Sequence, residues 1–176
     1  MVVLTLIDMF SRAVAGLAMI LVVALIGSMF YEVVARYGLN NPTVWAYDVS
    51  YMLNGVIFLL GAGFVLMKNL HVRVDFLSTR LPVRLQHTIN LVFDIFVLLP
   101  ALVWVSYRAV TEAWDSFVTG AVEVVSPWAP VIWPFEGGIA LGLVALTLQL
   151  IATIVRHGMG LADPASVPSP AENEAH

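Results

Sequence analysis

The chain has 176 residues, a mean hydropathy of +0.92 and 11% charged residues, whereas a soluble globular protein has roughly 25%. Its formal net charge of −4 argues against nucleic acid as a partner. The absence of cysteine excludes disulfides and thiol chemistry. These values indicate a protein that lies largely in a lipid bilayer.

Four apolar stretches are long enough to cross a membrane. Residues 13–31, 49–67 and 137–155 contain no Asp, Glu, Lys or Arg, and residues 88–107 contain only Asp94. About 20 apolar residues cross a hydrocarbon core of roughly 30 Å. The sequence therefore predicts an all-α integral membrane protein with four transmembrane helices. Their expected bounds are about 10–36, 46–68, 84–118 and 133–156, followed by a disordered cytoplasmic tail at 158–176.

The first apolar run is too long for a signal peptide and has no A-x-A-like cleavage site after it, so it is expected to remain as a membrane anchor. Asp8 precedes Arg12 by four residues, and Glu32 precedes Arg36 by four. This acid-first spacing favours ion pairs on a helix. The sequence "GLNNPT" at 38–43 then predicts a turn.

The predicted third helix, 84–118, is longer than a bilayer requires, so it is expected to tilt or to project. Pro100 removes a backbone donor and is expected to kink it. Arg108, Glu112 and Asp115 are expected beyond its apolar part, on the outer side, with the arginine paired to Glu112. The connection at 120–138 is rich in proline and tryptophan and is expected to be irregular or re-entrant.

The basic residues predict the orientation. Six would lie on the side of both termini and the 69–87 loop, against two on the other side, and the richer side faces the cytoplasm. Four tryptophans would form an aromatic belt at the outer interface. The six are Arg12, Lys68, Arg73, Arg80, Arg84 and Arg156; the two are Arg36 and Arg108; the tryptophans are Trp45, Trp114, Trp128 and Trp133.

No set of residues suited to catalysis or cofactor binding stands out. His71 and Asp75 are four residues apart, but two ligands without a third make a poor metal site. They suit a lipid or partner surface at the cytoplasmic side better. The histidines lie at helix ends or in the tail, whereas haem in a membrane helix bundle needs them inside. We therefore expect no enzyme activity, no cofactor and no metal.

Asp94 is the single acidic residue inside the third apolar stretch, where a carboxylate is costly and normally faces protein or water. His87, Asn90 and Asp94 share one helix stripe, and Asn54 is expected as a further buried polar group. Two interpretations remain open. Asp94 belongs to a proton or cation pathway, or it hydrogen-bonds to neighbouring helices or to Lys68; the structural interpretation is favoured.

Glycines predict where helices approach each other closely. Gly138 and Gly142 form a Gly-x-x-x-Gly motif in the fourth helix, and Gly61 lies in the second. Small residues at such spacing permit close backbone contact in membranes.

Residues 30–82 resemble the small membrane subunit of tripartite ATP-independent periplasmic (TRAP) transporters. The resemblance rests on Arg36-Tyr37, Asn41-Pro42, Trp45 with an acid three residues later, Gly61-Ala62, His71 and Asp75. The acid, Asp48, stands where the family often has glutamate, which keeps the charge.

The resemblance implies a multi-pass protein of the bacterial inner membrane with two partners. These are a large membrane permease subunit that carries the transport path and a periplasmic solute-binding protein that delivers an organic acid. Uptake would use an ion gradient, usually sodium, without ATP. The chain itself would be a scaffold and part of a docking surface. Candidate interface residues are Arg36, Trp45, Asp48, His71 and Asp75, and the residue analysis adds Asp94. The alternative is a self-sufficient, dimeric four-helix transporter that uses Asp94.

Overall fold

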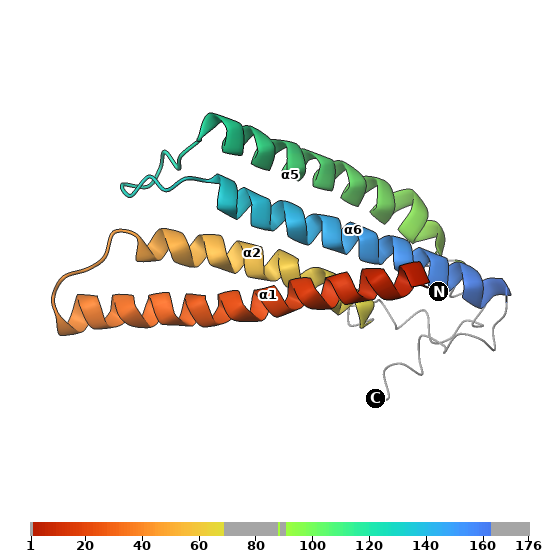
Figure 1. The fold of residues 1–176 in the computed structure, drawn as a ribbon, viewed down its shortest axis with the longest axis horizontal. Coiled ribbons are helices and arrows are strands. Elements are labelled where there is room, and N and C mark those ends of the chain that lie inside the picture. The colour runs from red at the N-terminus through yellow and green to blue at the C-terminus, as the bar shows by residue number, and fades with distance from the viewer. Residues whose placement is uncertain (1, 69–87, 89–90, 163–176) are drawn as a thin grey trace.

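The computed structural model describes residues 2–68, 88 and 91–162, and long helices dominate it (Figure 1). Four of these helical stretches are long and apolar enough to cross a membrane, so the predicted all-helical fold with four spans is confirmed. Which side each terminus faces stays a prediction. The elements are α1 (Val2–Val33), the π-helical turn η1 (Val34–Gly38), α2 (Ala46–Met67), the π-helical turn η2 (Asp94–Leu98), α5 (Leu99–Thr119) and α6 (Trp133–Ala162).

Helix α1 starts at Val2 rather than near residue 10, because no proline or glycine interrupts the chain before Gly16. The expected pairing of Asp8 within this helix is replaced by a pairing across helices. Arg156 of α6 donates to Asp8 Oδ2 at 2.7 Å. This ion pair joins the N-terminal part of α1 to the C-terminal part of α6.

Helix α6 holds the molecule together, since it contacts each of the other three long helices. Helices α1, α2 and α6 enclose the core, whereas α5 packs chiefly on α6 and lies apart from α1 in Figure 1. Most of the α5 surface is consequently uncovered. The buried core residues are Val14, Ala18, Val56, Leu60 and Ala145.

Glycines bring α2 and α6 together. A Cβ built on Gly142 would lie 2.7 Å from the carbonyl carbon of Leu59, and one built on Gly138 would lie 2.7 Å from Cγ1 of Val56. Gly61 was expected at such a contact, but a Cβ there meets no atom of the described chain within 4 Å. A Cβ built on Gly63, two residues further on, would instead lie 3.4 Å from the carbonyl carbon of Ala145.

The irregularity expected at Pro100 takes the form of the π-helical turn η2. The Leu99 N–H bonds to the carbonyl of Asp94, five residues back, directly before the proline. Pro100 lacks an N–H, and its ring crowds the carbonyl four residues earlier in an ordinary α-helix. The wider turn accommodates both effects without ending the helix.

Helices α5 and α6 run antiparallel in a well-defined register. Ser106 Oγ lies 2.8 Å from Thr147 Oγ1, and the rings of Phe117 and Trp133 meet edge to face at 5.5 Å. The two helices thus lie alongside each other up to the end of α5, so its C-terminal half does not project freely beyond α6.

Candidate functional site

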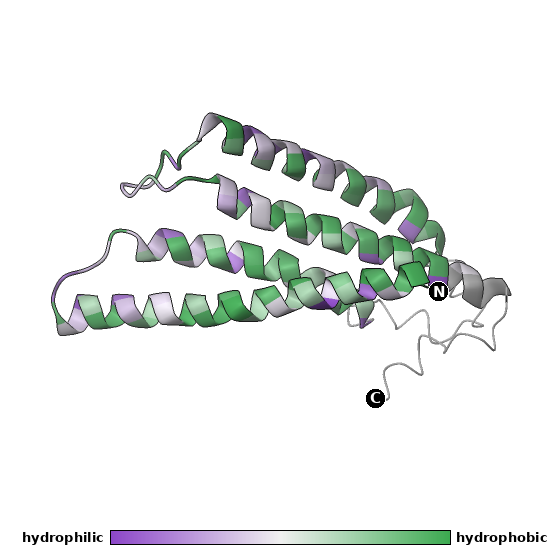
Figure 2. Cartoon of the chain, in the orientation of Figure 1, coloured by the Kyte–Doolittle hydropathy of each residue, from purple (hydrophilic) through white to green (hydrophobic). Residues whose placement is uncertain are grey.

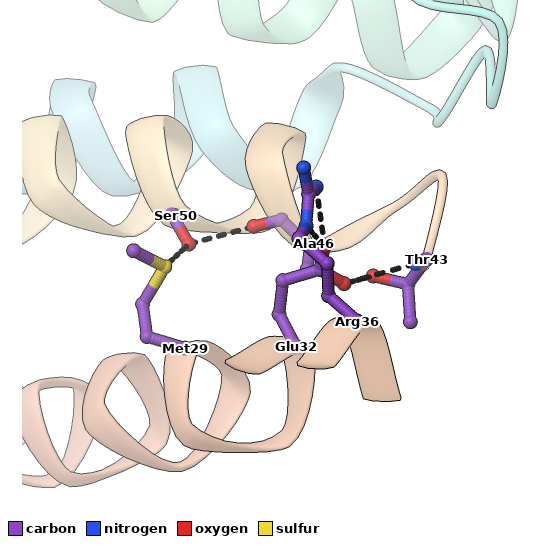
Figure 3. Close-up of polar contacts among 6 residues, drawn as sticks. All are labelled: Met29, Glu32, Arg36, Thr43, Ala46 and Ser50. Carbon is purple, nitrogen blue, oxygen red and sulfur yellow. Dashed lines mark hydrogen bonds and ion pairs between the residues drawn. The ribbon is translucent and has the colours of Figure 1, made fainter. Parts of the chain in front are cut away.

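Glu32 lies near the C-terminal end of α1, before the loop that leads to α2. Arg36 Nε donates to Oε1 of this carboxylate at 2.8 Å, which confirms the predicted helix pair. The backbone N–H of Thr43 donates to Oε2 at 2.9 Å, and the threonine hydroxyl donates to the same oxygen (Figure 3). The carboxylate therefore fixes the loop between α1 and α2, a role that the sequence did not reveal.

Trp45 completes this end of the α1–α2 pair. Its ring stacks on Tyr31 with centroids 5.7 Å apart. Ser50 Oγ lies 2.6 Å from the carbonyl of Ala46 and 2.9 Å from the sulfur of Met29, which links α2 back to α1 (Figure 3). Arg36 and Trp45 thus have clear structural partners within the chain, besides any role toward other subunits.

Asp48 is buried rather than presented to solvent, with 5% of its surface exposed. It accepts a hydrogen bond from the hydroxyl of Ser126, in the connection between α5 and α6. The Ser126 oxygen in turn accepts from the backbone N–H of Trp128 at 3.1 Å. Asp48 is therefore an anchor for that connection, and its partner 78 residues away could not be predicted from sequence.

The connection between α5 and α6, residues 121–132, forms a short hairpin that we call the outer hairpin. Glu123 N–H donates to the carbonyl of Pro130 at 2.9 Å, and a bridge pairs Val122 with Val131. Tyr51 of α2 donates to Glu123 Oε2 at 3.2 Å. The hairpin is irregular, as expected, and it is anchored to α2 at two points.

The tip of the outer hairpin is apolar and exposed. Val124 and Val125 are 89% and 88% exposed. Below the hairpin, in the first turn of α6, Oε2 of Glu136 is the one buried side-chain oxygen of the described chain without a hydrogen-bond partner. Its position at a helix N-terminus is favourable for a negative charge.

A polar cluster joins α1 to α6 at the opposite end. Ser11 Oγ donates to Gln149 Oε1 at 2.9 Å, and Gln149 Nε2 donates to Asp8 Oδ1 at 3.1 Å. Ser11 and Gln149 are fully buried. Like the Asp8–Arg156 ion pair, these hydrogen bonds each join a side chain of α1 to one of α6. We therefore interpret the cluster as structural.

Two further polar residues singled out from the sequence, Asp94 and Asn54, differ in exposure. Asp94 is half-buried at the start of η2. Asn54 was expected to be buried, but it is exposed, because the opposite side of α2 carries the glycines that meet α6. His71, Asp75, His87 and Asn90 lie outside the described residues.

The charged residues of α5 lie beside α6. Arg108 and Glu112 pair at 3.9 Å, as anticipated. Because Ser106 faces Thr147, Arg108 lies level with the middle of the candidate span Trp133–Arg156 of α6. Figure 2 shows polar residues along the half of α5 nearer its connection to α6.

Within residues 2–68, 88 and 91–162 there is no group of three His, Asp or Glu side chains that could hold a metal ion. The polar side chains that are brought together join one helix or loop to another. These contacts and the four candidate spans define a multi-pass helical membrane protein.

The model of the DctQ component of tripartite ATP-independent periplasmic transporters matches residues 25–158, so the chain belongs to this family of small permease subunits. A similar curated protein is the sialic acid TRAP transporter small permease protein SiaQ of Vibrio cholerae, which is 25% identical over 150 residues covering 84% of each chain. No solved structure matches the chain significantly.

Proposed function

We propose that this small permease subunit is a non-transporting scaffold for the large permease subunit and that its outer end helps to dock the periplasmic binding protein. The system would take up an organic acid. The relative's named solute, sialic acid, is itself an organic acid, which supports the class without identifying the solute here.

The scaffold role is supported chiefly by the hydrogen bonds that the buried polar side chains make with other elements of the chain. Ser11 bonds to Gln149, Ser106 to Thr147, and Asp48 to Ser126, each joining two elements of the chain. A transport site instead needs polar groups that converge on a solute, usually near the midplane at broken helices. The described residues offer no such convergent set.

The docking role is supported by the outer hairpin. Its anchors, Asp48 and Tyr51, both belong to α2, so the exposed valines at its tip are held at a fixed position. A rigid apolar projection loses little conformational entropy on binding. Arg36 and Trp45 occupy the same end of the molecule. Asp94 belongs to the opposite end. We propose that Asp94, and also His71 and Asp75, which lie outside the described residues, contact the large subunit.

The orientation can be tested first. With reporters fused at residue 40, at residue 78 and at the C-terminus, we expect residue 40 outside and the other two in the cytoplasm, because six basic residues oppose two. A reporter active on the outer side at residue 78 would overturn both the topology and the docking role of the outer hairpin.

Reconstitution tests the scaffold role. The chain alone in liposomes should move no labelled organic acid, with or without a sodium gradient, because a desolvated carboxylate solute needs several compensating polar groups. Addition of the large subunit and the binding protein should restore uptake. Empty liposomes serve as the control. Solute exchange by the chain alone would reject the scaffold role and favour the self-sufficient transporter that uses Asp94.

A further inference from the structure

Three charged residues form a stripe on α5 within the candidate membrane span Leu91–Thr119. The α5 stripe consists of Arg108, Glu112 and Asp115, which are four and three residues apart and therefore share one side of the helix. The Ser106–Thr147 contact places Arg108 level with residue 145 of α6. That level is roughly 17 Å from either end of the Trp133–Arg156 span, at 1.5 Å per residue.

The side chains of the stripe are exposed in the isolated chain. Ser106 and Ser116 are buried and mark the side of α5 that packs on α6. The side chains of Arg108 and Glu112 are each 63% exposed, and Asp115 is exposed as well. In a membrane this surface would meet lipid unless another protein covers it.

Lipid is a poor environment for this surface. Charged side chains within a bilayer are costly and almost always face protein or water. Arg108 and Glu112 partly compensate each other at 3.9 Å, but no cationic side chain of the described residues pairs with Asp115. The stripe therefore carries one net negative charge that a covering surface has to match.

We propose that the α5 stripe is the intramembrane contact for the large permease subunit, through a helix with a basic or hydrogen-bond-donating side chain opposite Asp115. This inference rests on the proposed scaffold function and names the surface that performs it. A second copy of this chain fits less well. Two-fold symmetry about the membrane normal would place equivalent residues at equal depth, and Asp115 would meet Asp115.

Charge-removing variants test the stripe. Asp115→Asn and Arg108→Gln should leave the thermal midpoint of the isolated chain unchanged, because both side chains are exposed and the ion pair of Arg108 with Glu112 lies within α5. The affinity of the chain for the large subunit in nanodiscs should fall at least about tenfold, as expected when a buried charge loses its partner. Asp115→Glu, which keeps the charge, should restore most of it. Unchanged affinity for all variants would overturn the proposal.

Photo-crosslinking identifies the neighbour directly. A photoreactive benzoyl-phenylalanine in place of Trp104, one turn from Arg108 and 68% exposed, should crosslink to the large subunit in the intact complex. Ile20 on α1, 66% exposed and also within a span, is the matched position for comparison.

The outcomes separate the two proposals. A crosslink from the Trp104 position to the large subunit supports the α5 surface. A copurifying complex with no such crosslink, or with a crosslink to a second copy of this chain, overturns the inference and leaves the scaffold role intact. Failure of the two subunits to copurify at all overturns both.

Discussion

Replacement of Gly142 by alanine is expected to lower the thermal midpoint of the isolated chain in detergent by about 5 °C or more. The new Cβ would lie 2.7 Å from the carbonyl carbon and 2.9 Å from the carbonyl oxygen of Leu59. Both are backbone atoms of α2, so the clash is relieved only if the helices separate. Overpacking costs roughly 1–3 kcal/mol, and 1 kcal/mol corresponds to about 2–4 °C in a chain of this size.

Two other glycines of α6 provide controls. A Cβ on Gly137 meets no atom of the described chain within 4 Å, so Gly137→Ala should leave the midpoint unchanged or raise it slightly. Gly138→Ala should have an intermediate effect, because its neighbours at 2.7 Å and 2.9 Å are side-chain atoms of Val56. Equal midpoints for Gly142→Ala and Gly137→Ala would contradict the close backbone contact.

The features set by local chemistry could be predicted from sequence. Uninterrupted apolar runs predicted the four spans, because each must be about 20 residues long to cross the hydrocarbon core. The acid-first spacing predicted the Glu32–Arg36 pair, and Asn41-Pro42 predicted the turn after it. These features depend on the covalent chain or on residues one helical turn apart.

The features set by helix packing could not be predicted. Asp8 pairs with Arg156, 148 residues away, although Arg12 is at the spacing that favours a pair within the helix. The resemblance named Asp48 as a candidate interface residue, but its burial and its hydrogen bond with Ser126, 78 residues away, could not be predicted. Which long-range partner a polar side chain finds depends on how the helices are arranged, and hydropathy does not contain that information.

The neighbour of the charged half of α5 could not be predicted either. Hydropathy divided the third helix into an apolar part and a charged end, and Arg108 was expected on the outer side. The Ser106–Thr147 contact aligns α5 with α6 such that the charged half lies beside apolar turns of its neighbour. Within a bilayer, charged side chains almost always face protein or water, and this is the premise of the proposed contact with the large permease subunit.

Replacement of Asp48 by alanine is expected to reduce binding-protein-dependent uptake by the assembled transporter at least about tenfold. The substitution removes the acceptor of the Ser126 hydroxyl. A hydrogen bond to a charged group contributes about 1.5–3 kcal/mol, and 1.4 kcal/mol is a tenfold change in an equilibrium constant. The outer hairpin would then detach from α2 in a large fraction of molecules. Asp48→Asn should keep most of the activity, since its amide oxygen still accepts.

Two further variants separate anchoring from docking. Tyr51→Phe removes only an exposed hydrogen bond of 3.2 Å and keeps the ring contact with Phe135, so uptake should change less than about threefold. Val124→Asp alters the exposed tip without touching an anchor. It should weaken binding of the periplasmic protein to the complex while leaving the thermal midpoint unchanged. If Asp48→Ala lowers the midpoint but neither Asp48→Ala nor Val124→Asp changes that affinity, Asp48 stabilises the fold and the binding protein docks elsewhere. If Asp48→Ala and Val124→Asp both weaken binding, the outer hairpin is the docking surface and Asp48 is the residue that holds it in position.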